Sequence, residues 1–366
     1  MKIQAITHFL ESIAPLPLQE SYDNAGLIVG SKDTEVTGIL ITLDVTEMVI
    51  EEAMTKKCNL IVAHHPIIFK GLKKLNGKNY VERTVIKAIQ NNIAIYAAHT
   101  NLDNIAGGVN FKIAEKLQLE NVKILAPKTN AILQLTTFTP ITHTALVLKD
   151  LNDAGAGQIG RYKDCGFFSR GTGTYRPTKD TTPFEGVIGQ LSTVQEDKIE
   201  VIFPFYLQDK ILKTLQTSHP YEEVAYYLQV LENKNLETGS GAIGTLAILQ
   251  DELTFLNHLK KTFQVTGLRH SPLLNKPIQK VAVCGGAGSF LLRDAIAAGA
   301  DIFITSDFKY HEYFDADNKI VVADIGHYES EVCTKELFYD LLSKNFSNIA
   351  TLLGETVTKP YNYLNS

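Results

Sequence analysis

The stretch ILITLDVTEMVIEEAMTKKCNLIVAHH (residues 39–65) contains the repeated unit on which the fold is built. Its two ends, ILIT and LIVA, are uninterrupted apolar runs, and the segment between them carries Val49, Ile50, Ala53 and Met54 at helical spacing. Strands that are apolar on both faces are typical of a parallel sheet covered by helices. The stretch therefore predicts a strand, a helix and a second, parallel strand.

A second copy of this unit occurs later in the chain. VAVCGGAGSFLLRDAIAAGADIFITSD (281–307) aligns with 39–65 without a gap, and the apolar positions of the two expected helices coincide. A further apolar strand follows each copy, within 93–103 and within 320–331. The sequence predicts an α/β fold in which two related α/β lobes with mostly parallel sheets form one domain.

A segment of different composition, richer in Thr, Gly and aromatic residues, lies between the two copies. AILQLTTF and KIEVIFPF read as strands, GRYKDCGFFSRGTGTYRP predicts a hairpin, and QDKILKTLQTSHP predicts a helix that stops at Pro220. This order of elements predicts an inserted ferredoxin-like α+β domain. We therefore expect a discontinuous domain made of residues 1–126 and 237–366, interrupted by an inserted domain at 127–236.

Composition excludes several classes of protein. The chain has 366 residues and a formal net charge of −5, which argues against a general nucleic-acid binder. No apolar run approaches the roughly 18 residues that a membrane span needs. The four cysteines show no disulfide-type spacing, which fits a reducing, cytoplasmic location.

Polar residues follow the expected strands at the point where each strand ends. Because the carboxyl ends of parallel strands meet at one edge of a sheet, where α/β proteins build their sites, we expect these residues to converge. They are His64, His65, His99, Asp103, Ser306, Asp307, His327 and Glu331.

Two adjacent histidines at the end of a strand suit two metal ions better than one, because successive side chains of a regular strand point to opposite faces. Asp103 could serve one ion or bridge both. His327 and Glu331 lie on one face if a helix begins near Glu329 or Ser330. Imidazoles with carboxylates are ligands for zinc, manganese, iron or nickel, which this pattern does not distinguish.

Each of these features also has an ordinary structural explanation. A histidine pair, or His and Glu four residues apart, also occurs in proteins without a metal. His99 could face the substrate, support a ligand from behind or be structural, and Asp307 could cap a helix. Lys70 and Lys73 could attract an anionic substrate or belong to a solvated loop. CGGAGS (284–289) lacks the complete phosphate-loop spacing and favours a tight turn.

Several motifs in fixed order resemble the NIF-three-like family, also called the GTP cyclohydrolase I type 2 family. They are SYDNAGLIVG, VAHHPIIFKGLKKL, AAHTNLDNIAGGVN, VAVCGGAGS, GADIFITSDFKYHE and VVADIGHYESE, and they span essentially the whole chain. The insert, with HPYEEVAYYLQV, resembles the PII/CutA-like middle domain of the longer bacterial members.

The resemblance implies two divalent metal ions per subunit, held by His64, His65, Asp103, His327 and Glu331. It also implies a toroidal homohexamer and, from the family name, hydrolytic opening of the GTP purine ring to a dihydropterin triphosphate. We therefore expect a metal-dependent hydrolase of a nucleotide-like or other anionic small molecule. The alternatives are a metal-dependent phosphoesterase and a non-enzymatic metal-binding regulatory or scaffold protein.

Overall fold

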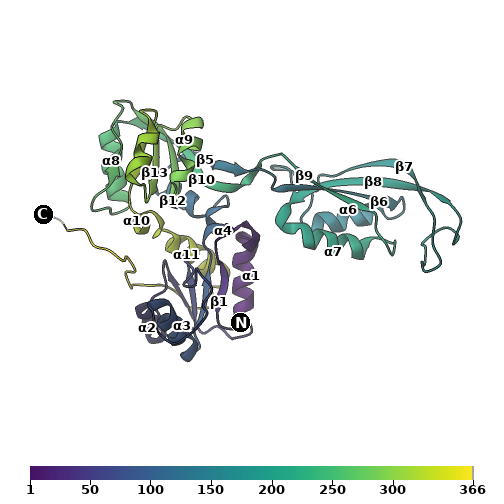
Figure 1. The fold of residues 1–366 in the computed structure, drawn as a ribbon, viewed down its shortest axis with the longest axis horizontal. Coiled ribbons are helices and arrows are strands. Elements are labelled where there is room, and N and C mark those ends of the chain that lie inside the picture. The colour runs from purple at the N-terminus through teal and green to yellow at the C-terminus, as the bar shows by residue number, and fades with distance from the viewer. Residues whose placement is uncertain (365–366) are drawn as a thin grey trace. The chain divides into compact units, whose positions relative to one another are not determined.

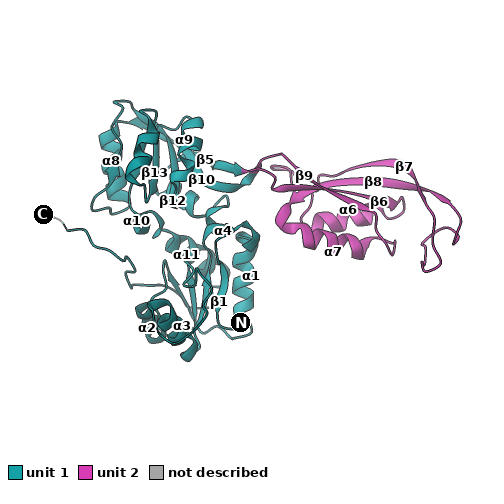
Figure 2. Ribbon diagram, in the orientation of Figure 1, with its two compact units in different colours: residues 1–127, 236–366 teal, residues 128–235 magenta. Residues whose placement is uncertain are grey.

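The computed structural model describes residues 1–364, which form two compact units. Unit 1 comprises residues 1–127 together with the described residues from 236 onward, and unit 2 comprises residues 128–235 (Figure 2). Each unit has its own sheet or sheets and its own buried apolar core. In the part of the chain that the structure describes, no helix is both long and apolar enough to cross a membrane.

The first lobe of unit 1 is a five-stranded sheet. Strands β15, β2, β3 and β4 are parallel to their neighbours, and β1 is antiparallel to β4. In spatial order the strands are β1 (Gly26–Val29), β4 (Ala94–Ala97), β3 (Leu60–Ala63), β2 (Ile39–Thr42) and β15 (Thr351–Leu353). The residues of β2, β3 and β4 are buried on both faces, as expected for strands covered by helices.

The helices of this lobe follow from local signals in the sequence. Thr46 caps α2 by accepting the N–H of Val49, and Asn79 caps α3 by accepting the N–H of Glu82. Apolar side chains of α2 and α3 pack with those of the sheet in one core. The helices are α1 (Ile3–Ile13), α2 (Glu47–Thr55), α3 (Tyr80–Gln90), α4 (Thr100–Asp103) and α5 (Val109–Lys116), with a 3-10 turn at Leu16–Leu18.

The second lobe of unit 1 is a six-stranded sheet flanked by α8 (Glu252–Thr262) and α9 (Leu292–Ala297), which Figure 1 shows on opposite sides of β13. Strands β12, β13 and β14 are parallel, whereas β10 is antiparallel to β12 and β11 is antiparallel to β14. The strands in spatial order are β11 (Arg269–His270), β14 (Val321–Asp324), β13 (Ile302–Ser306), β12 (Ile278–Ala287), β10 (Asn235–Gln250) and β5 (Glu120–Lys128), and 3-10 turns lie at Ser289–Leu291 and Tyr310–Ala316.

The expectation of mostly parallel sheets is therefore correct for the first lobe and wrong for the second. The chain leaves unit 1 through β5 and returns through β10, so these strands are joined to unit 2 and not to a crossover helix. A parallel neighbour requires such a crossover, which is why this side of the sheet pairs differently.

Two consecutive helices connect the lobes of unit 1. Helix α10 (His327–Glu331) packs on β12 and β13, and α11 (Thr334–Asn345) packs on β2 and β15, so Figure 1 shows both between the sheets. Helix α10 begins at His327, two or three residues earlier than we expected, because Gly326 adopts φ +93° and accepts the N–H of Ser330.

Unit 2 is a four-stranded antiparallel sheet with two helices, α6 (Thr144–Asp153) and α7 (Gln208–Ser218). The strands in spatial order are β7 (Phe167–Tyr175), β8 (Ser192–Pro204), β6 (Ile132–Pro140) and β9 (Tyr226–Leu231), and a 3-10 turn lies at Phe205–Leu207. The segment 160–177, expected to form a hairpin by itself, provides β7 only. The second strand of the hairpin is β8, which pairs antiparallel with β7. The hairpin is longer than expected because the polar and glycine-containing residues 176–191 form the loop between the two strands.

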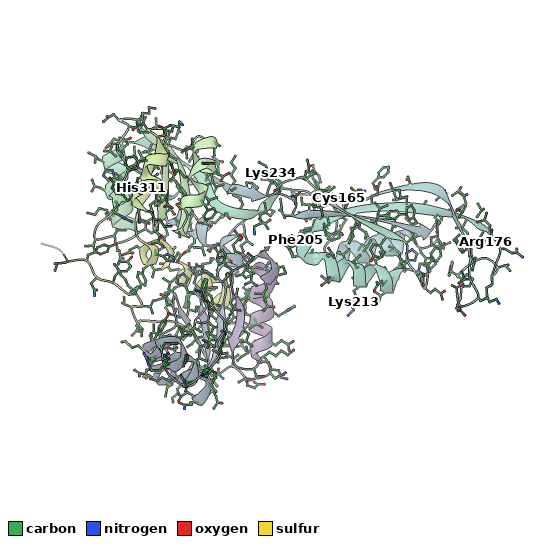
Figure 3. The ribbon with its side chains drawn as sticks, viewed as in Figure 1. Cys165, Arg176, Phe205, Lys213, Lys234 and His311 are labelled. Carbon is green, nitrogen blue, oxygen red and sulfur yellow. The ribbon has the colours of Figure 1, made fainter. Side chains whose placement is uncertain are left out.

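Helix α7 stabilises unit 2 through its buried face, so Ile211→Ala should lower the free energy of unfolding by about 2–5 kcal/mol. Lys213→Ala on the same helix is the control and should change it by less than about 0.5 kcal/mol, because Lys213 projects into solvent (Figure 3). Urea unfolding followed by circular dichroism measures both. Equal effects of the two substitutions would contradict the assigned packing.

Candidate metal centre

The strand ends of both lobes meet at one cavity in unit 1. His64 and His65 follow β3, while His99 immediately precedes α4 and Asp103 is the last residue of that helix, just after β4. Helix α10 carries the remaining two residues, which come from the second lobe. Of the residues expected at the site, His65, His99, Asp103, His327 and Glu331 line this cavity, whose volume is about 1020 Å³.

The carboxylate of Glu331 lies at the centre of the cluster and is only 3% exposed. Its Oε2 is 3.0 Å from Nε2 of His65 and 3.0 Å from Nε2 of His327. Its Oε1 is 3.8 Å from Nε2 of His64. One carboxylate thus faces imidazoles that come from both lobes.

Two buried atoms in this cluster have no hydrogen-bond partner among the described residues: Nε2 of His64 and Oδ1 of Asp103. They face each other across 3.8 Å, too far for a hydrogen bond. An unsatisfied buried polar atom costs about 1–3 kcal/mol, so such atoms are normally paired. A nitrogen lone pair opposite a carboxylate oxygen fits a cation between them.

Every histidine of the cluster is oriented by a contact at its other ring nitrogen. Nδ1 of His64 donates to the backbone oxygen of Ala98 at 2.9 Å. The remaining Nδ1 atoms each face a carboxylate: His65 faces Asp44 at 2.7 Å, His99 faces Asp23 at 2.8 Å and His327 faces Asp307 at 2.7 Å. Such outer partners fix ring orientation and raise ligand basicity in metal sites.

The glycine turn 284–289 makes room for the Glu331 carboxylate. Gly286 has φ +62°, and a Cβ there would lie 2.4 Å from Oε1 of Glu331. The N–H of Gly286 donates to Oγ of Ser330 at 3.0 Å, which ties the turn to α10. The turn therefore positions a carboxylate, which explains why it lacks the spacing of a phosphate loop.

The electrostatics of the cluster favour bound positive charge. Burial lowers the pKa of His64 to about 4, so this imidazole is neutral at physiological pH. Burial also opposes charge on His65, but its hydrogen bonds to Asp44 and Glu331 outweigh burial and raise its pKa to about 10. His327 behaves in the same way, with a pKa of about 9. A metal ion bound at Nε2 of His65 or His327 would therefore displace a proton from that nitrogen.

The two buried carboxyls of the cluster have opposite pKa shifts. Burial and the nearby Glu331 charge raise the pKa of Asp103 well above its usual range. Burial opposes the charge on Glu331, but the surrounding imidazoles hold its pKa well below the usual range. A metal cation beside Asp103 would favour its ionised form.

Part of this site was not expected from the sequence. Asp44 belongs to the same strand-end edge, directly after the β2 region, and could have been found by that rule. Asp23 lies in the loop before β1 and gave no signal of its role. Asp307 pairs with His327, so its predicted alternative as a helix cap is not what the structure shows.

The expected substrate lysines do not reach the cavity. Lys70 and Lys73 are exposed and are not among the lining residues, because the loop that carries them continues past the strand end into solvent. The lining, all within the described residues, includes no lysine or arginine. It is instead aromatic and acidic; among its members are Tyr22, Phe69, Tyr80, Phe290, Tyr328, Tyr361, Glu20 and Asp44.

The fold and the cluster together define a mixed α/β protein with several sheets and a partly buried group of histidines and carboxylates able to hold a metal. The chain belongs to the Duf34/NIF3 (NGG1p interacting factor 3) family, whose model matches residues 1–360. This confirms the family resemblance seen in the sequence.

Relatives cover the chain almost completely. A protein of Bacillus subtilis named GTP cyclohydrolase 1 type 2 homolog is 36% identical over 370 residues, covering 99% of this chain and 98% of the relative. One of the same name from Halalkalibacterium halodurans is 37% identical over 366 residues, with 99% and 98% covered. The crystal structure of a Bacillus cereus protein related to NIF3 matches with a TM-score of 0.84 and 38% identity, covering 100% of this chain and 99% of that one.

Asp23→Asn should destabilise the protein by about 1.5–3 kcal/mol at pH 7, since it removes a buried charged acceptor from His99 and from the N–H of Thr100. Burial opposes the Asp23 charge, but these hydrogen bonds outweigh it and lower its pKa from 3.8 to about 2. Its contribution is therefore full above about pH 4 and is lost as the pH falls towards 2. Urea unfolding between pH 7 and pH 3 measures the difference.

The exposed Asp33→Asn, which removes a surface ion pair with Lys2, is the control and should have little effect. Equal stability of wild type and Asp23→Asn at pH 7 would contradict the role given to Asp23.

Proposed function

We propose that the protein is a metal-dependent hydrolase that holds two divalent ions at the cavity of unit 1. The observation that carries this proposal is the pair of unpartnered buried atoms, His64 Nε2 and Asp103 Oδ1, beside the Glu331 carboxylate. A second group, His65, His327 and Glu331, also presents one ligand atom each within 4.8 Å of one another. Family membership supports the proposal, because relatives carry the name GTP cyclohydrolase 1 type 2 homolog.

The distances support a particular division of ligands. His64 and Asp103 would hold one ion, because their unpartnered atoms face each other. His65 and His327 would hold the other, since their Nε2 atoms lie 3.4 Å apart. Glu331 faces both pairs and would help to hold both ions, and Asp103 would be a ligand of the first.

Two divalent ions supply Lewis acidity, which lowers the pKa of water and stabilises negative charge that develops during hydrolysis. The chain itself supplies orientation. Asp44 and Asp307 hold the imidazoles of His65 and His327 in place. His99, held by Asp23, lies beside His64 and His65 with ring centroids 5.2 and 5.3 Å away, where it can exchange a proton with a bound molecule.

The lining favours a substrate with a flat ring, because aromatic side chains surround the acidic centre. A nucleotide such as GTP has this feature, and bound divalent ions would supply the positive charge for its phosphates, since the chain contributes no lysine or arginine to the described lining. The second candidate is a phosphoesterase, because a pair of metal ions suffices to hold a phosphodiester without help from lysine or arginine.

Two further proposals concern the organisation of the chain. We interpret unit 2 as an inserted ferredoxin-like domain of the PII/CutA kind, which its β-α-β-β-α-β order supports. We also propose the homohexameric ring that the family resemblance implies. Exposed apolar side chains on β7 and β9, among them Phe167, Phe168, Tyr227 and Val230, offer surface that self-association would cover.

Metal analysis tests the centre directly. Glu331→Gln keeps the size of the side chain but removes the charge that faces both histidine pairs, so the variant should retain at most one of two ions per chain. Glu336→Gln on the exposed face of α11 is the control and should retain both. Elemental analysis of protein dialysed against zinc or manganese gives the stoichiometry. Two ions retained by Glu331→Gln would refute the ligand assignment.

Activity separates the candidate reactions. Protein loaded with zinc or manganese is assayed with GTP, followed by pterin fluorescence, and with bis(p-nitrophenyl) phosphate. We expect turnover of one of them, and a loss of about 100-fold or more in His64→Ala, because losing a ligand should cost more than the roughly 10–100-fold of losing an outer partner. Lys73→Ala should retain full activity, since Lys73 is outside the cavity lining. A fully loaded protein that turns over neither substrate would favour the non-enzymatic alternative.

A further inference from the structure

The C-terminal arm, which we define as residues 355–361, has no regular secondary structure but is held at several points of unit 1. It follows β15 and forms part of the cavity wall through Thr358, Pro360 and Tyr361. None of the proposed metal ligands belongs to it. Its contacts nevertheless lead to the residues that support those ligands.

The first anchor of the arm is Glu52 of α2. This carboxylate accepts the N–H of Glu355 at 2.7 Å, the N–H of Thr356 at 2.9 Å and the hydroxyl of Thr356 at 2.6 Å. Burial opposes the charge of Glu52, but these bonds and Lys56 outweigh it and lower its pKa to about 2. The start of the arm is therefore fixed to the first lobe.

The second anchor is Asp44, the carboxylate behind His65. Its Oδ2 accepts the hydroxyl of Thr358 at 2.6 Å, while its Oδ1 faces Nδ1 of His65 at 2.7 Å. Both oxygens are thus occupied, one by the imidazole and one by the arm. This arrangement fixes the rotation of the carboxylate and, through it, the direction of Nε2 of His65.

The third anchor is Glu329, a buried residue of α10 between the proposed ligands His327 and Glu331. Its carboxylate accepts hydrogen bonds from Lys359 and, at 3.0 Å, from the hydroxyl of Tyr361. The ammonium of Lys359 also lies over the rings of Tyr361 and Tyr363, 4.9 and 4.4 Å from their centroids. The arm therefore spans from the first lobe to the helix that carries ligands of the second.

We propose that Thr358 is a positioning residue of the metal centre: it orients His65 through Asp44, and the C-terminal arm is the element that holds it there. The inference rests on the proposed metal centre. Loss of outer partners of metal-binding histidines typically costs 10–100-fold in metal affinity. Thr358 acts one contact further out, so we expect a loss of about threefold to tenfold.

Thr358→Val tests this by removing the hydroxyl while keeping the shape of the side chain. Thr356→Val is the matched control, because it also removes a hydroxyl that donates a 2.6 Å hydrogen bond to a carboxylate. That carboxylate, Glu52, is remote from the histidines and keeps its two backbone N–H donors. Thr358→Ser restores the hydroxyl. Titration of metal-free protein with Mn²⁺ or Zn²⁺, followed calorimetrically, should show weaker binding for Thr358→Val alone.

Hydrogen exchange gives a second measurement on the wild type. Coupling between metal binding and docking of the arm is reciprocal, so metal binding should slow amide exchange of residues 355–359. This protection should be lost in Thr358→Val and kept in Thr356→Val.

The outcomes separate the two proposals. A wild-type protein that binds no metal refutes the metal centre itself. A wild type that binds metal, with unchanged affinity and arm protection in Thr358→Val, refutes the role of Thr358. Equal losses of affinity in the two valine variants refute it as well, because the effect would then come from general loosening of the arm.

Discussion

The interaction on which the site depends is the seating of the Glu331 carboxylate among imidazoles of the other lobe. Glu331 reaches His64 and His65 only because α10 packs against the second sheet while the next helix packs against the first. The absence of a side chain at Gly286 leaves the space that the carboxylate fills. A buried charge of this kind is tolerated where it is closely paired, so the cluster also constrains how the lobes meet.

The charge balance of the cluster explains its arrangement of outer partners. Burial lowers the pKa of His64 and keeps that imidazole neutral, whereas the carboxylates that contact His65 and His327 raise the pKa of these two imidazoles and favour their protonated forms. The two halves of the site therefore differ in electrostatic environment. This difference would make two bound ions unequal in affinity, with protons competing chiefly at the half that contains His65 and His327.

Much of the fold could be predicted because both copies of the repeated unit carry strong local signals. The apolar strands ending at Ala63 and Ser306 and the helices between strands are as expected. The pairing of β10 and β5 in the second sheet could not be predicted, since it depends on where the chain leaves for unit 2. The start of α10 was predicted two or three residues too late, because the residues around Gly326 do not indicate its positive φ.

The sequence by itself determined the strand-end positions of the histidines and acidic residues, because strand ends and helix spacing are local properties and the motifs recur in order in the family. Only the tertiary structure decided which groups support them. Asp23, Asp44 and Asp307 lie 76, 21 and 20 residues from their histidine partners, and Thr358 is 314 residues from Asp44. Apart from Asp44, which follows the strand-end rule, no local pattern encodes such contacts, because they exist only after each lobe has folded and the C-terminal arm has packed on it.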